Sequence, residues 1–161
     1  IHHVSFGHDV ETAYLLIEAA HVIHLDDPKT LTIAKKMVDH SLQNGWDDSL
    51  GGFYDQGYYF KTKPGMSIIV AGKNWWTQSE ALNTLLLMAD QFPNDKLAYY
   101  NQFKKLWKYC QAYLIDHEHG DWYEEGLDHD PQRKTANKGH IWKATYHQYR
   151  ALTGCIDRLR K

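Results

Sequence analysis

Residues 5–16 read SFGHDVETAYLL and predict the first helix of the chain. Ser5 at its start is a suitable N-cap, and the apolar residues that follow recur at helical spacing. His8, Glu11 and Tyr14 stand three residues apart, so they lie on one side of this helix together with apolar residues. An imidazole, a carboxylate and an aromatic ring therefore face the interior, where other helices must complete a pocket.

Further along the chain, apolar residues at helical spacing predict more helices joined by turns. Residues 51–60 read GGFYDQGYYF and predict an aromatic hairpin or loop, whereas residues 61–72 are predicted to be irregular. The segment DWYEEG at 121–126 echoes GFYDQG at 52–57, so helical hairpins with long aromatic loops repeat along the chain. The helices are predicted at about residues 5–24, 29–42, 74–91, 96–117 and 141–159.

Hairpins of this kind can close into a ring of paired helices, an α/α toroid whose inner helices direct side chains into a central cavity. We therefore predict an all-α fold with a single domain at residues 1–161. His8, Trp76 and His147 would each come from an inner helix, and the second and fourth helices would be outer ones. The chain begins at Ile1 without a methionine and ends at the close of a helix, so we expect it to be a piece of a longer protein.

Composition is that of a soluble globular protein, with 43% hydrophobic and 24% charged residues. The net charge of -2, with no basic block, speaks against a nucleic-acid or anionic-membrane partner, and no apolar run is long enough to span a bilayer. Cys110 and Cys155 lack metal-type spacing and are expected to be free thiols, which favours a cytoplasmic location. Aromatic residues reach 14%, and their flat faces suit sugar rings as well as a core.

Two histidines are the strongest candidates for chemistry. His8 has Glu11 as a helical neighbour, and His147 has Tyr146 and Arg150. Two imidazoles that face one cavity can serve as base and acid near neutral pH, because the unperturbed pKa of an imidazole is about 6.5. The alternative is that each is a packed, hydrogen-bonded core histidine, and the eleven histidines of this chain keep that alternative open.

A second cluster combines tryptophans with a carboxylate. Trp76 and Glu80 are four residues apart and share a helix face, which would offer a sugar an aromatic platform and a hydrogen-bonding group. Trp75 and Trp76 point in different directions because they are adjacent, so one of them is expected in the core. Trp142 stands at the head of the last helix and would cap a pocket.

Other charged groups are weaker candidates. The histidines at 2–3 with His8 and Asp9 lack the spacing of helical metal ligands, so we predict no metal site. The run HEHGD at 117–121 is expected to be a solvated helix end, and the two glutamates at 124–125 would diverge in a hairpin. The sequence also lacks a glycine-rich phosphate loop and a nucleophile elbow, and we predict no cofactor.

Three blocks of the sequence resemble the signatures of a known family. The blocks at 5–16, 73–80 and 142–147, with GGFYD at 51–55, are similar in order and spacing to those of the N-acylglucosamine 2-epimerase and cellobiose 2-epimerase family. The resemblance implies an (α/α)6 barrel of which this chain would be the C-terminal half. In that family the histidines that match His8 and His147 are the acid and base catalysts.

The resemblance also implies which residues surround the sugar. Cellobiose-type enzymes usually carry tryptophan at the position of Tyr14 and proline at that of Thr145, and these differences leave the identity of the sugar open. The expected substrate-binding residues are Glu11, Tyr14, Trp76, Glu80 and Trp142.

The resulting hypothesis is a sugar 2-epimerase that acts on a mono- or disaccharide through an enediolate, without cofactor or metal. Three alternatives stay open at this point: an aldose–ketose isomerase, an (α/α) glycoside hydrolase that acts through carboxylates, and a non-catalytic sugar-binding toroid. The chain alone is expected to be inactive, and to self-associate through the apolar faces that further helices would cover.

Overall fold

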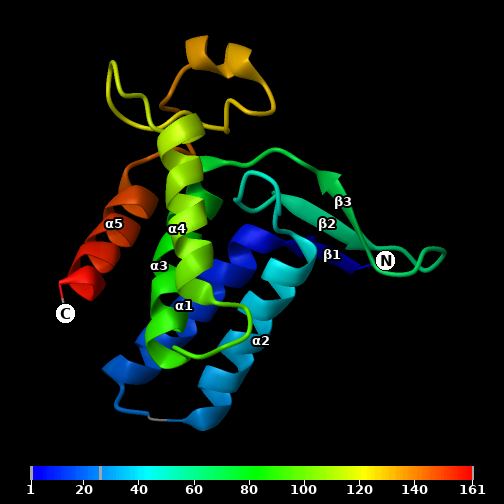
Figure 1. The fold of residues 1–161 in the computed structure, drawn as a ribbon, viewed down its shortest axis with the longest axis vertical. Helices are drawn as coiled ribbons and strands as arrows, with labels where there is room; N and C mark the ends of the chain where they lie inside the picture. The colour runs from blue at the N-terminus through cyan, green and yellow to red at the C-terminus, as the bar shows by residue number, and fades with distance from the viewer. Residues whose placement is uncertain (1, 26, 161) are drawn as a thin grey trace.

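The computed structural model describes residues 2–25 and 27–160. The described residues form five α-helices and one small antiparallel sheet (Figure 1). The α-helices are α1 (Phe6–Val22), α2 (Pro28–Asn44), α3 (Trp75–Gln91), α4 (Tyr99–Tyr109) and α5 (Tyr146–Leu159). The strands are β1 (His2–Ser5), β2 (Gln56–Tyr59) and β3 (Met66–Val70), and short turns of π-helix (Cys110–Leu114) and 3-10 helix (Pro131–Thr135) complete the regular structure.

Helix α3 lies at the centre of the helical layers. It packs against α1, α4 and α5, while α2 packs against the outer side of α1 (Figure 1). Residues 77–88 of α3 are all buried, because neighbouring helices cover this helix on several sides. The inner layer is therefore α1, α3 and α5 and the outer layer α2 and α4, as the sequence predicted.

Local signals explain where two of the five described α-helices begin. The Asp27 carboxylate accepts a hydrogen bond from the Lys29 amide (2.9 Å) at the start of α2, and the Asn74 side chain accepts one from the Thr77 amide (3.1 Å) at the start of α3. Ser5 occupies the N-cap position of α1, but its side chain makes no capping hydrogen bond. The Ser5 hydroxyl is directed instead toward His8.

The aromatic loops repeat in geometry as well as in sequence. In each loop an aspartate, Asp47 or Asp116, exchanges two backbone hydrogen bonds of 2.9 Å with the residues four and five positions later. The residues four positions later are Gly51 and Gly120, which have φ angles of +87° and +74°, a conformation that favours glycine. The echo between the two segments therefore reflects one turn built twice.

The sheet corrects one prediction and adds a strand for which none was made. Residues 61–72 were predicted to be irregular, yet β3 lies within them, and β1 precedes the first helix. Strand β2 is central and antiparallel to both neighbours, with His2 opposite Tyr59 and Ser5 opposite Gln56. The pairing of β1 with β2 joins segments far apart in the sequence, which local patterns do not reveal, whereas β2 and β3 follow each other along the chain. Figure 1 shows the sheet on the side of the bundle opposite α5.

The ends of three predicted helices also differ from the structure. The first helix ends at Val22 because His24 adopts a left-handed conformation (φ 53°). The fourth begins only at Tyr99, after the left-handed Ala98, and its π-helical turn ends at Leu114. The last begins at Tyr146 rather than at residue 141, because residues 140–143 form a turn closed by a backbone bridge.

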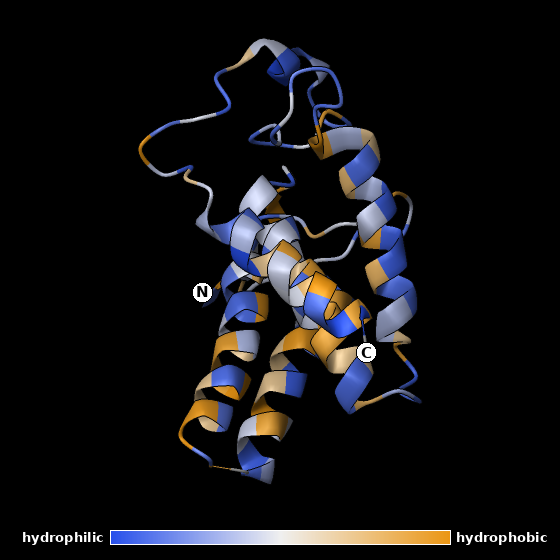
Figure 2. Ribbon diagram, turned by 90° about the vertical axis from the view of Figure 1, so that its left-hand side faces the viewer, coloured by the Kyte–Doolittle hydropathy of each residue, from blue (hydrophilic) through white to orange (hydrophobic). Residues whose placement is uncertain are grey.

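Polar and apolar residues alternate around the helices (Figure 2). Apolar side chains remain exposed near the end of α1, as at Val22 (72% exposed), and on α5, as at Tyr149 (73%). Within residues 2–25 and 27–160, no helix combines the length and apolarity needed to cross a membrane.

Candidate active site

A cavity of about 210 Å³ lies where the first turns of the three inner helices meet. His8 stands in the first turn of α1, Trp76 in that of α3 and His147 in that of α5. Three helix starts at one end of the bundle thus gather side chains that the sequence spreads over 140 residues. The lining residues are His8, Glu11, Trp75, Trp76, Trp142, Tyr146 and His147.

The two histidines flank the same indole. The ring centroid of Trp76 lies 4.9 Å from that of His8 and 5.5 Å from that of His147. His147 is buried, with 6% exposure, and its ring packs against Tyr146 at 3.8 Å, whereas His8 is exposed. The structure thus brings both imidazoles to one cavity from opposite neighbours of α3.

A charged network holds the buried histidine. His147 Nδ1 lies 2.6 Å from Glu80 Oε1, and the same oxygen accepts a hydrogen bond from Arg150 Nη2 at 2.6 Å. Arg150 Nη2 also donates to Glu11 Oε1 at 2.5 Å. Burial by itself would lower the pKa of the Arg150 guanidinium, but its hydrogen bonds and charge interactions with Glu80 and Glu11 raise that pKa above its usual value. The guanidinium therefore stays charged between two carboxylates.

The two histidines have different partners. His8 Nδ1 lies 2.8 Å from the Ser5 hydroxyl, which can either donate or accept a hydrogen bond. His147 faces an acid that is completely buried. An ionised carboxylate only accepts hydrogen bonds, so it selects the ring form of His147 that carries a proton on Nδ1. The network thus defines the chemistry of His147 and leaves His8 adaptable.

The remaining predicted residues lie at different depths. Trp142 is 77% exposed at the rim of the cavity, and Trp75 is buried (5% exposed), as predicted for one of the adjacent tryptophans. Tyr14 does not line the cavity. It lies beside Arg150, whose guanidinium carbon is 6.0 Å from the tyrosine ring centroid, and lines a neighbouring hollow of about 620 Å³.

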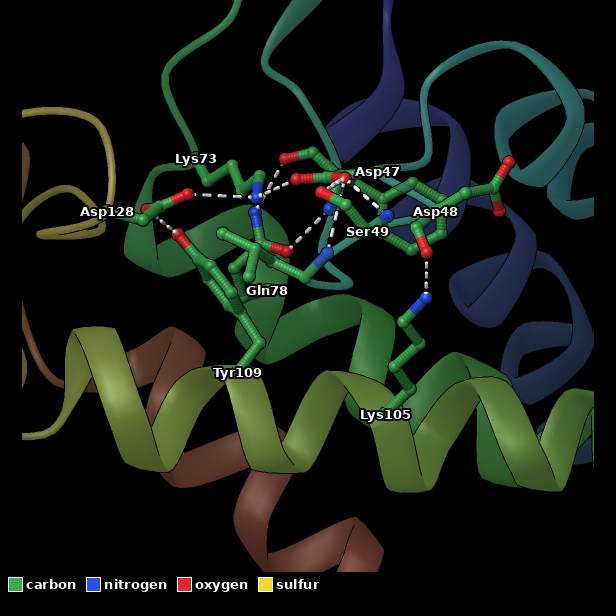
Figure 3. A network of polar contacts seen from close by, with 10 residues as sticks. Asp47, Asp48, Ser49, Lys73, Gln78, Lys105, Tyr109 and Asp128 are labelled. Atoms are coloured by element: carbon green, nitrogen blue, oxygen red, sulfur yellow. Dashed lines mark hydrogen bonds and ion pairs between the residues drawn. The ribbon is translucent and has the colours of Figure 1, made fainter.

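A second buried network forms a frame at the start of α3 (Figure 3). Lys73 Nζ lies 2.7 Å from Asp47 Oδ2 and 3.0 Å from Asp128 Oδ2, and the Tyr109 hydroxyl donates to Asp128 Oδ1 at 2.7 Å. Burial opposes ionisation of Asp47, but hydrogen bonds from Lys73 and Ser49 hold its pKa well below the usual range. Lys73 thereby joins the two repeated loops directly before α3 begins.

Gln78 completes this frame by binding a loop backbone. Its side-chain oxygen accepts a hydrogen bond from the Phe53 amide (2.8 Å), and its side-chain nitrogen donates to the Phe53 carbonyl (2.9 Å). Gln78 is fully buried two residues after Trp76, so the same turn of α3 that carries the cavity indole is clamped to the first aromatic loop. The frame therefore determines where Trp76 lies.

Sequence reasoning missed two features of the site. Arg150 was noted as a helical neighbour of His147, but its bonds to Glu11 and Glu80 join three helices and have no local signal. The partnership of Ser5 with His8 was likewise hidden, because a serine before a helix reads as a cap. The spacing of three between Ser5 and His8 is the signal that was available.

One group of side chains has the geometry of metal ligands. Among the described residues, ligand atoms of Glu11, Glu80 and His147 lie within 4.8 Å of one another. However, Arg150 Nη2 is within hydrogen-bond distance of both carboxylates. A cation therefore already neutralises these acids, and the donor set does not fit an additional metal ion.

Comparison with known proteins places this site in a family. The family model described as N-acylglucosamine 2-epimerase (GlcNAc 2-epimerase) matches residues 2–151. The chain belongs to this family. The match includes the helices that carry His8, Trp76 and His147.

Relatives of the family are epimerases and isomerases of sugars. The chain is 28% identical over 162 residues to a cellobiose 2-epimerase of Ruminococcus albus, covering 96% of this chain and 38% of the relative. It is 29% identical over 156 residues to a D-mannose isomerase of Marinomonas mediterranea, covering 96% of this chain and 36% of the relative. The chain thus spans under two fifths of the length of these curated relatives.

Solved structures of N-acylglucosamine 2-epimerase relatives share the fold. A crystal structure of D-mannose isomerase superimposes with a TM-score of 0.81 at 26% identity, over 96% of this chain and 37% of that one. Cellobiose 2-epimerase from Spirochaeta thermophila gives a TM-score of 0.73 at 24% identity, over 98% and 38%. The paired inner and outer helices are therefore part of an (α/α)6 barrel.

Proposed function

We propose that the protein is a sugar 2-epimerase that acts on a reducing mono- or disaccharide. His147 removes the proton at C2 of the sugar, and His8 returns a proton to the same carbon. The observation that carries this proposal is the 2.6 Å contact between His147 Nδ1 and the buried Glu80 carboxylate. Membership in a family whose relatives are named as sugar epimerases and isomerases supports the substrate class.

The contact with Glu80 allows His147 to act as a base. With its proton on Nδ1 and donated to Glu80, the ring keeps a lone pair on Nε2. The carboxylate also stabilises the imidazolium that forms when Nε2 accepts a proton. In the open-chain sugar the aldehyde acidifies the proton at C2, so an imidazole near neutral pH is strong enough to remove it.

The reaction then passes through a cis-enediolate. His147 takes the C2 proton, the electrons of the C–H bond move into a C1–C2 double bond, and the C1 oxygen gains negative charge. His8 returns a proton to the opposite face of C2, the electrons move back, and the aldehyde forms again with inverted configuration. In the reverse direction the two histidines exchange roles, so no redox step is required.

Aldose–ketose isomerisation is the second candidate, because the same enediolate protonated at C1 gives a ketose. The D-mannose isomerase relatives favour keeping this alternative. A glycoside hydrolase is disfavoured, since Glu11 and Glu80 are both ion-paired with Arg150 and neither is free to protonate a leaving oxygen. A non-catalytic binding protein would retain its function after both histidines were replaced.

Proton NMR in heavy water tests the proposal. The full-length protein is incubated with cellobiose or with D-mannose, and the products are identified together with the position of deuterium. We expect the C2 epimer with deuterium at C2. A ketose labelled at C1 would establish isomerisation instead, release of two monosaccharides would establish hydrolysis, and turnover without deuterium would exclude the two-histidine scheme.

A further inference from the structure

Arg150 connects two carboxylates and, through one of them, the imidazole of His147, so that the three inner helices are joined. Its Nη2 donates to Glu11 Oε1 of α1 (2.5 Å) and to Glu80 Oε1 of α3 (2.6 Å), and the same Glu80 oxygen lies 2.6 Å from His147 Nδ1 of α5. Glu11 Oε1 is also within 4.0 Å of His147 Nδ1. One guanidinium nitrogen thus lies between both carboxylates beside the base.

Without that cation, an ionised Glu80 would be a buried charge with no compensating positive group. It is completely buried, and burial disfavours the charged form of a carboxyl group. A second carboxylate, Glu11, shares the same guanidinium nitrogen, so removing the guanidinium would leave two like charges next to each other. Glu80 Oε1 faces both Arg150 Nη2 and His147 Nδ1, so without the guanidinium this same oxygen can carry a proton toward Nδ1.

We propose that Arg150 is a positioning residue that keeps Glu80 ionised and thereby holds the proton of His147 on Nδ1, with the lone pair of Nε2 toward the sugar. This inference rests on the proposed role of His147 as a base. A neutral Glu80 can donate a hydrogen bond to Nδ1, and the ring proton of His147 then moves to Nε2. In that form His147 cannot accept the C2 proton.

The surroundings of His147 contain few other groups that could take over this task. Glu80 faces it from α3, and Glu11 from α1, with His8 of α1 on the far side of Trp76. On α5 itself the described contacts of the ring are with Tyr146. Arg150 is the positive charge that contacts both acids in this part of the described structure.

The ring form of His147 can be observed directly. Protein labelled with ¹⁵N-histidine gives long-range proton–nitrogen correlations that distinguish a proton on Nδ1 from one on Nε2, and His147→Gln assigns the signal among the eleven histidines. Arg150→Met removes the charge, and Arg150→Lys retains it. Arg158→Met is a matched control on the same helix, because Arg158 pairs with Glu18 (3.0 Å) and Asp90 (3.7 Å), away from the cavity.

We expect the Nδ1-protonated form in the unaltered protein, in Arg150→Lys and in Arg158→Met, and the Nε2-protonated form in Arg150→Met. In sugar turnover, Arg150→Met should lower kcat at least about tenfold with a smaller change in KM, because the base and not the binding surface is affected. Its pH profile should shift as well, whereas that of Arg158→Met should not.

A retained Nδ1-protonated ring in Arg150→Met at neutral pH would overturn the inference. If Arg150→Met does not fold, Arg150→Gln keeps hydrogen-bond donors without the charge and decides the same question. The spectra also separate this inference from the proposed function. A ring-form change without any sugar turnover in the unaltered protein would leave the role of Arg150 intact and refute the epimerase proposal.

Discussion

Lys73→Met removes a buried cation from between two aspartates. The Lys73 side chain is 2% exposed, and its Nζ lies 2.7 Å from Asp47 and 3.0 Å from Asp128, each of which is 11% exposed. Methionine retains most of the side-chain volume and deletes the charge. Removing one partner of a buried ion pair costs about 3–5 kcal/mol, which is a large share of a typical stability of about 5–15 kcal/mol.

Urea unfolding followed by tryptophan fluorescence measures this loss. Lys105→Met is the matched control, because Lys105 donates to the Asp48 carbonyl oxygen at the edge of the same loop in a hydrogen bond that is exposed. The control should change the free energy of unfolding by no more than about 0.5 kcal/mol, as is usual for surface substitutions. The slope of the free energy of unfolding against urea concentration is measured for each variant and compared with that of the unaltered protein. A changed slope would reveal a change in the denatured state.

The loss should depend on pH in one direction. Lys73 holds the pKa of Asp47 below the usual value in the folded protein, so the stabilisation is complete above the unfolded pKa of about 3.9 and disappears as the pH falls below it. The difference between the unaltered protein and Lys73→Met should therefore narrow below about pH 4. A loss under about 1 kcal/mol at pH 7, or one independent of pH, would refute the argument.

Three other outcomes are expected. In the full-length protein, His8→Ala and His147→Ala should each reduce turnover at least about 10²-fold, measured as deuterium entry at C2. Trp76→Ala should weaken sugar binding, measured by calorimetry, more than it lowers the free energy of unfolding. Replacement of the buried Trp75 by alanine should instead cost about 3–5 kcal/mol in urea unfolding. Equal losses of stability in the two variants would make Trp76 a core residue. The chain of residues 1–161 should sediment as a self-associated species, because exposed apolar faces on α1 and α5 favour burial. Tyr149→Ser should weaken that association, and a stable monomer in dilute solution would contradict the prediction.

Local sequence patterns were sufficient to predict the bounds of a helix where both of its ends are set by neighbouring residues. Helix α3 was predicted at about residues 74–91 and spans Trp75–Gln91, because the Asn74 cap and Pro93 both act within one turn. Helix α5 shows the opposite case. Ile141 and Trp142 extend its apolar pattern, but a backbone bridge in the preceding turn delays the helix to Tyr146.

The sheet could not be predicted in the same way. Strands β1 and β2 have four residues each, which is too short for a clear alternation of polar and apolar side chains. Gly57 of β2 lies against Phe6 and Met66, where an added Cβ would stand 2.5 Å from Met66 Sδ and 3.1 Å from Phe6 Cζ. This fit depends on three segments that only the tertiary structure brings together.

The sequence by itself determined the helical hairpins, the repeated aromatic turn, and the placement of His8, Trp76 and His147 on inner helices. These properties follow from spacings of three to four residues and from turn chemistry, which act between neighbours in the chain. Only the tertiary structure decided that Arg150 joins Glu11 and Glu80, partners 139 and 70 residues away. The reason is physical: a charge is paired by whatever the packing of helices brings within about 3 Å, and no local periodicity specifies that neighbour.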